Sequence, residues 1–159
     1  MSNIIYAKIT GKKQGLISAG CSSFDSIGNR YQKGHEDDIM IFSLESEISR
    51  LQHVVHEPVS FVKPVDKSTP LLGIAISENE ELSIVFEEYR TTATGGVELY
   101  FSRKLTGAFL ERIKTISPHT LNNNDKLPEE LILVRYSSIT WQHHIAGTTG
   151  YSIWDERVY

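Results

Sequence analysis

The chain has 159 residues, of which 40% are hydrophobic and 23% are charged, and its formal net charge is −4. A chain of this length can bury about 70% of its unfolded surface, and this composition is that of a globular protein and not of a disordered one. Its 16 Lys and Arg residues are spread along the sequence, whereas nucleic-acid binding needs a dense basic stripe, so no nucleic-acid partner is predicted. Cys21 is the only cysteine, which excludes an internal disulfide.

The first ten residues predict a β-strand. Ile5, Ala7 and Ile9 alternate with a second set of side chains on the opposite face. The segment lacks the basic region and the long apolar stretch of a secretory signal peptide. No apolar run approaches the roughly 18 residues that cross a bilayer. We therefore expect no membrane insertion and, if the protein is exported, a route other than general secretion.

Alternating apolar residues predict further strands along the chain, at residues 39–48, 59–63, 82–90, 97–103, 105–116 and 131–141. With the two ends of the chain this gives about eight or nine strands. Gly95 and Gly96 predict a tight hairpin turn after residue 90, and Gly107 predicts a bulge or bend. Leu82, Ile84 and Phe86 share one face of their strand, and Val97, Leu99 and Phe101 share one face of theirs. Phe42, Leu44 and Ile48 also share a face, which is expected to pack the core.

Residues 66–79 predict one short amphipathic α-helix. The segment begins with capping side chains and a proline in the first turn, and apolar residues recur at Leu71, Leu72, Ala75 and Ile76. Strands joined by turns rich in Gly and Asn, with a single helix, predict a mainly β fold, either a small barrel or a sandwich. We find no linker or internal repeat, which predicts one domain over residues 1–159.

Signals for catalysis or metal binding are weak. His53 and His56 are three residues apart, and His143 and His144 are adjacent, so on strands the members of each pair point to opposite faces. Cys21 has no neighbouring base that would activate it as a nucleophile, and a buried structural role is favoured. The pairs Glu87–Glu88 and Glu129–Glu130 are interpreted as solvated strand edges. No catalytic residue, metal site or cofactor is predicted.

Several segments together resemble the Hcp (haemolysin-coregulated protein) family, the tube subunits of bacterial type VI secretion systems. The matching segments are residues 15–22 (GLISAGCS), 34–38 (GHEDD), 65–72 (VDKSTPLL), 117–119 (SPH) and 143–157 (HHIAGTTGYSIWDER). The most diagnostic residues, to which a structural role is assigned, are Asp66, Lys67, Ser68, Thr69, Pro70, Gly150, Tyr151, Trp154, Asp155, Glu156 and Arg157.

This resemblance implies a two-sheet antiparallel β-barrel with one helix at about residues 66–79. It also implies six copies in a ring, and rings that stack head to tail into the inner tube. The implied partners are a spike (VgrG-like) protein, sheath and baseplate components, and small effector proteins in the lumen. The subunit would assemble in the bacterial cytoplasm and then be secreted to the medium or a target cell. Because the sequence stops at the last motif, we expect no C-terminal toxin extension.

The resemblance also suggests where copies meet. The polar segment 45–58 is expected to contact the adjacent ring through Glu47, Arg50, Leu51, His53, Val54 and His56; the alternative is a mobile solvent loop. Ser43, Glu45 and Glu47 are expected to line the lumen or a subunit joint, with a solvated outer face as the alternative. Residues 155–157 are interpreted as an ion pair at a subunit joint or as a charged strand end. Two other functions remain open: a metal-dependent β-barrel enzyme and a monomeric ligand-binding barrel.

Overall fold

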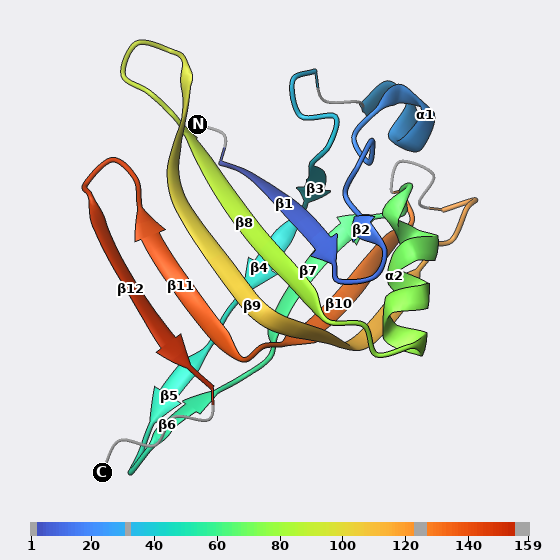
Figure 1. The fold of residues 1–159 in the computed structure, drawn as a ribbon. Helices are drawn as coiled ribbons and strands as arrows, with labels where there is room; N and C mark the ends of the chain where they lie inside the picture. Colours follow the sequence, from blue (N-terminus) through green and yellow to red (C-terminus); the bar gives the residue numbers. More distant parts are fainter. Residues whose placement is uncertain (1–2, 31–32, 123–126, 155–159) are drawn as a thin grey trace.

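The computed structural model describes residues 3–30, 33–122 and 127–154, which form two packed layers of antiparallel strands with helices at one end (Figure 1). The helical elements are α1 (Phe24–Ile27), the 3-10 helix η1 (Gly28–Arg30) and α2 (Ser68–Ser77). The strands are β1 (Ile4–Gly11), β2 (Gly15–Leu16), β3 (Ile39–Ile41), β4 (Ser43–Glu45), β5 (Ile48–Arg50), β6 (Val54–His56), β7 (Val59–Pro64), β8 (Leu82–Thr91), β9 (Val97–Ile116), β10 (Glu129–Arg135), β11 (Ser138–His143) and β12 (Thr148–Ile153).

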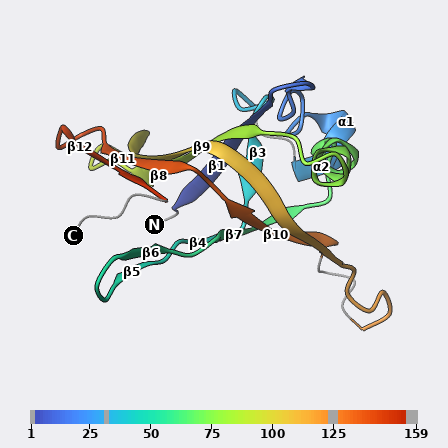
Figure 2. The same ribbon diagram turned by 60° about the horizontal axis from the view of Figure 1, so that its bottom comes forward.

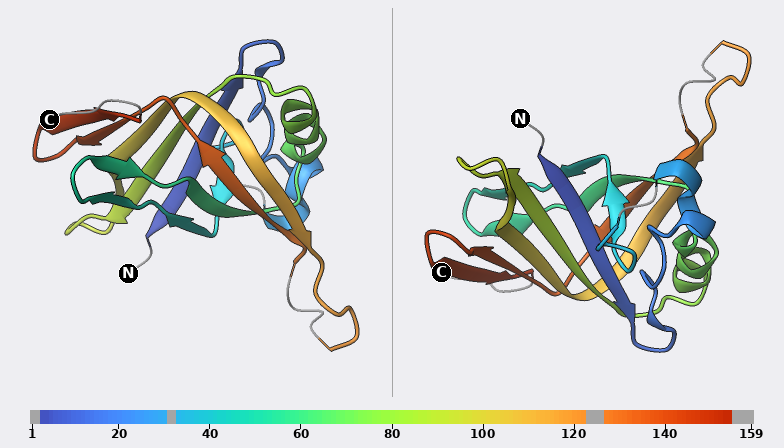
Figure 3. Two further views of the ribbon diagram at one scale, coloured as in Figure 1. Left: turned by 90° about the horizontal axis from the view of Figure 1, so that it is seen from below. Right: turned by 90° about the horizontal axis from the view of Figure 1, so that it is seen from above.

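Ten strands belong to one sheet with the order β2-β1-β8-β9-β10-β7-β4, to which β3 is added at β1 and the β11–β12 pair at β9. Figures 2 and 3 show how this sheet folds over into the two layers. Residues 39–45 connect the layers, because β3 pairs with β1 whereas β4 pairs with β7. The predicted mainly β, antiparallel fold is confirmed, but the strand pairing does not define a closed barrel.

The long strand β9 passes from one layer to the other at Gly107. Up to Ala108, β9 pairs with β8 and, over residues 101–106, with β11; from Phe109 on it pairs with β10. Leu82 is paired with Ala108 but Ile84 with Leu105, so β9 carries one extra residue at this point. Gly107 has φ +61°, and the backbone N–H of Ser137 donates to the Gly107 carbonyl at 3.1 Å. The predicted bulge is confirmed.

The hydrophobic core lies between the two layers. Phe61 of β7 packs against Phe86 of β8 with ring centroids 5.2 Å apart. Leu82 and Ile84, which were predicted to share a face with Phe86, are also buried. The other buried core residues include Ala7, Ile9, Ile17, Cys21, Ile39, Leu72, Ala75, Leu105, Ala108, Ile132, Val134 and Ile139.

The prediction that Phe42 and Ile48 pack the core is wrong. Phe42 and Ile48 are 41% and 36% exposed, because the expected strand 39–48 is divided among three short strands. The chain changes its partner from β1 to β7 at Phe42, so the alternation of buried and exposed residues shifts there. Val97 is also exposed, and Leu99 and Phe101 are only half-buried, because this part of β9 belongs to the hairpin that extends beyond the core (Figure 1).

The predicted helix is confirmed as α2, which buries Ser68, Leu72 and Ala75. The short helix α1 and the turn η1 were not predicted. Within the polar segment 45–58, residues 48–56 form the β5–β6 hairpin. Within the described residues, every helix is too short or too polar to cross a membrane.

Candidate assembly surfaces

The β5–β6 hairpin projects away from the body of the molecule (Figure 1). It forms a separate two-stranded sheet in which Ile48 pairs with His56 and Arg50 with Val54. Leu51 at its tip is 95% exposed. Ile48 and Val55 of the same hairpin are also exposed, at 36% and 45%, so its apolar side chains are available for contact with another molecule. The geometry therefore places Glu47, Arg50, Leu51, His53 and Val54 on one projecting element.

His56 lies at the base of this hairpin and is only 5% exposed. Its Nδ1 is 2.8 Å from the Tyr136 hydroxyl and its Nε2 is 2.9 Å from the Ser152 hydroxyl. The imidazole stacks on Trp154, with ring centroids 5.7 Å apart and an angle of 21° between the planes. His56 therefore fixes the hairpin to the main sheet and does not belong to the projecting surface on which the sequence had placed it.

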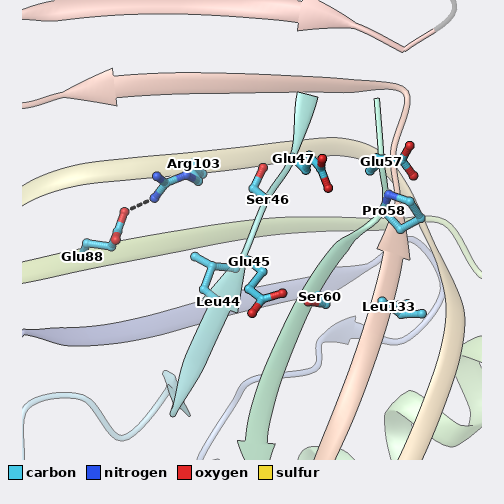
Figure 4. Close-up of a pocket in the computed structure, with 10 residues that line it drawn as sticks. All are labelled: Leu44, Glu45, Ser46, Glu47, Glu57, Pro58, Ser60, Glu88, Arg103 and Leu133. Atoms are coloured by element: carbon cyan, nitrogen blue, oxygen red, sulfur yellow. Dashed lines mark hydrogen bonds and ion pairs between the residues drawn. The ribbon is translucent and has the colours of Figure 1, made fainter. Parts of the chain in front are cut away.

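An acidic cleft of about 550 Å³ lies between the base of the hairpin and the main sheet (Figure 4). Among the described residues, four carboxylates line it, from Glu45, Glu47, Glu57 and Glu88, together with one cation, Arg103. Arg103 forms an ion pair with Glu88. Glu45 and Glu47 thus lie together at this cleft, whereas Ser43 does not line it. Glu57, Glu88 and Arg103 could not be assigned from the sequence, since other strands and connections supply them.

The segment Asp66–Pro70 holds the start of α2 against the sheet. Lys63 is fully buried, and its ammonium group donates to Asp66 at 3.0 Å and to Glu130 at 2.8 Å. Asp66 also accepts the backbone N–H of Ser68 at 2.9 Å, as a helix-capping side chain does. Thr69 donates its hydroxyl to Glu130 at 2.5 Å. The interpretation of Glu130 as part of a solvated strand edge is wrong. Glu130 is buried, and it lies opposite the buried Lys63 on the neighbouring strand β7.

The remaining motif residues differ in their surroundings. Lys67 and Pro70 are exposed, and the Lys67 backbone N–H donates to the Ser26 hydroxyl at 2.8 Å. Trp154 packs on the core, whereas Tyr151 on β12 is 72% exposed. Its neighbour Gly150 is also exposed. The residues Asp155, Glu156 and Arg157 lie outside the described part of the chain.

The candidate nucleophile Cys21 is buried, and burial together with the nearby Asp66 carboxylate raises the pKa of its thiol to about 12. At neutral pH the thiol is therefore protonated and a poor nucleophile. Among the described residues, no three His, Cys, Asp or Glu side chains are grouped so that they could hold a metal ion.

Comparison with known proteins identifies the family. Residues 6–143 match the family model described as "Type VI secretion system effector, Hcp". The chain is 36% identical to the "Major exported protein" of Pseudomonas aeruginosa, over 97% of this chain and 96% of that protein. It is also 44% identical to "Uncharacterized protein YhhZ" of Escherichia coli K12, over 93% of this chain but only 37% of that longer protein.

Solved structures of Hcp proteins have the same fold as this chain. The "Secreted protein Hcp3 from Pseudomonas aeruginosa" superposes with a TM-score of 0.88 and 36% identity, over 98% of this chain and 100% of that one. The Hcp1 protein of E. coli EAEC 042 has the same fold, with a TM-score of 0.78 at 20% identity, over 95% of this chain and 98% of that one. These similarities show that the chain is a protein of the type VI secretion class. The chain belongs to the Hcp family.

Proposed function

We propose that this chain is a structural tube subunit, of which six copies close into a ring and the rings stack head to tail. The observation that carries the proposal is the projecting β5–β6 hairpin with its exposed Leu51. Such a hairpin supplies the contact that a stacked assembly needs between one ring and the next. The alignment over nearly the full length of the exported and secreted Pseudomonas proteins supports it.

A ring of identical copies needs two different patches on each subunit that fit one another and a rotation that closes. In this proposal the whole chain, residues 1–159, acts as one domain and catalyses no reaction. The subunit assembles in the bacterial cytoplasm with sheath, baseplate and spike (VgrG-like) components. It is then expelled, and small effector proteins travel in the lumen.

Changing both Leu51 and Val54 to Asp is expected to abolish stacking and to leave single rings intact. The two carboxylates would have to be desolvated in the contact between rings. Electron microscopy of tubes and native mass spectrometry of rings measure the two effects. Ile74→Asp, at an exposed position on α2 far from the hairpin, is the control that keeps stacking. Tubes of normal length from the double variant would refute the hairpin contact.

We further propose that Ser43, Glu45 and Glu47 face the lumen, where the acidic cleft holds basic side chains of an effector. The double change Glu45→Lys and Glu47→Lys is then expected to reduce the amount of effector that co-purifies with the rings. The introduced lysine side chains would repel the basic side chains of the effector, which the carboxylates attract. The matched control reverses two exposed carboxylates elsewhere, Glu78→Lys and Glu111→Lys. An unchanged effector yield would argue against this placement.

A further inference from the structure

The contacts of His56 connect three parts of the chain that are remote in sequence. His56 ends β6, Tyr136 lies at the corner between β10 and β11, and Ser152 and Trp154 belong to β12 and the residues directly after it. Tyr136 in turn packs edge-on against Trp154, with ring centroids 4.9 Å apart. The hairpin is thus held to the main sheet by one imidazole in an aromatic pocket.

Both ring nitrogens of His56 face hydroxyl groups. A neutral imidazole has one donor and one acceptor nitrogen, and a hydroxyl can serve as either, so this arrangement is satisfied in either tautomer. An imidazolium ion is less well accommodated. It would be a buried charge whose hydrogen-bonded partners are two neutral hydroxyls, Tyr136 and Ser152.

Among the described residues, the other groups around the ring do not offset this charge. Burial raises the pKa of Tyr136 to about 12, so its hydroxyl is neutral near pH 7. The charged neighbours along the chain are Glu57 and Arg135, and among the described contacts neither forms a hydrogen bond or ion pair with His56. Stacking on the indole of Trp154 favours a cation to a small extent. Burial prevails and lowers the pKa of His56 below its ordinary value.

We propose that His56 is a pH-dependent latch, which holds the β5–β6 hairpin in its projecting position when neutral and releases it when protonated. The direction follows from linkage. Since the pKa is lower in the latched state than in the released state, protons bind preferentially to the released state. The latch is therefore fully closed above about pH 6.5 and opens as the pH falls below that value. Its effect on tubes rests on the proposed function, because a released hairpin no longer presents an ordered surface to the next ring.

Hydrogen exchange of the intact protein tests the latch directly. The protection of a peptide covering residues 46–58, corrected for the intrinsic pH dependence of exchange, is expected to fall about fivefold to tenfold from about pH 7.5 to about pH 5. His56→Phe keeps a ring on Trp154 but cannot titrate, so its protection is expected to be independent of pH. His144→Gln removes an exposed histidine between β11 and β12, and it is the control that keeps the wild-type response.

Two results would overturn the latch: equal protection of the wild-type hairpin at both pH values, or the same loss of protection in His56→Phe. A second measurement needs no variant. Exchange of the imidazole Cε1–H in the wild-type protein gives the midpoint of His56 titration, which is expected to lie below about 6.5 and to coincide with the loss of protection. A midpoint at or above that value contradicts the proposal.

Electron microscopy at the same two pH values separates this proposal from the tube function. Tubes at about pH 7.5 that come apart into rings at about pH 5 in the wild type, but persist in His56→Phe, support both. If no tubes form at any pH, the tube function fails, and the exchange experiment still decides the latch. If tubes form and hairpin protection does not respond to pH, the latch fails alone.

Discussion

Replacing Lys63 with Met is expected to destabilise the fold by about 3–5 kcal/mol, because breaking a buried ion pair leaves an uncompensated charge. The Lys63 ammonium lies between the Asp66 and Glu130 carboxylates, all three of them almost completely buried. Without the cation, two carboxylates remain in the interior, one at the start of α2 and one on β10. Urea denaturation at one fixed protein concentration measures the effect, since assembly makes apparent stability depend on concentration.

The matched control is Lys12→Met, which removes an exposed lysine whose ion pair with Glu81 spans 3.7 Å. Such a surface pair contributes only about 0–1 kcal/mol, so this variant is expected to be close to wild type. Adding Glu130→Gln to Lys63→Met is expected to restore part of the lost stability, because one of the two stranded charges is removed. A Lys63→Met protein as stable as the Lys12→Met protein would contradict this view of the cluster.

Gly107→Val is expected to destabilise the protein by about 2–5 kcal/mol. A left-handed conformation costs a residue with a β-carbon about 1–2 kcal/mol, and overpacking adds about 1–3 kcal/mol. Gly107 has φ +61°, and a β-carbon placed on it would lie 2.5 Å from the Ser137 hydroxyl oxygen. The same denaturation experiment measures the change. Since Gly107 lies where β9 crosses between the layers, the strain falls on the connection between them.

Two further variants isolate the cause. Gly73→Ala lies in α2 with open space around it, so it is expected to stabilise the protein by about 0.5–1 kcal/mol. Ser137→Ala combined with Gly107→Val removes the clashing oxygen but leaves the Ser137 β-carbon at 2.9 Å, so only a partial recovery is expected. The account of the bulge is wrong if Gly107→Val unfolds at the wild-type urea concentration.

The elements that could be predicted from the sequence are those that neighbouring residues determine. Gly107 and Gly95 both have positive φ, and this conformation favours glycine, so the bulge and the β8–β9 turn could be located in advance. The helix α2 could be predicted for a similar reason, since its capping side chains and first-turn proline immediately precede its apolar residues.

The prediction of one strand over residues 39–48 was wrong, because alternating apolar residues identify the buried face only while the strand keeps the same pairing partner. Its chain pairs with β1 up to Ile41 and with β7 from Ser43, so the buried side changes at Phe42. No local pattern marks this change, which depends on where two other strands lie in the folded sheet.

The side-chain clusters were missed because they join distant residues. Lys63 and Glu130 are 67 positions apart, and they meet because β7 and β10 are paired in a register that places them opposite one another. His56 is 80 positions from Tyr136 and 96 from Ser152. The sequence alone therefore located the projecting segment, but it did not reveal that His56 anchors it.

Electron microscopy of the purified protein, together with its native mass, decides whether copies of this chain join around a hole. Annular particles with the mass of six chains are the expected result. Separate single-chain particles at high protein concentration in mild buffer, without closed rings, would contradict it.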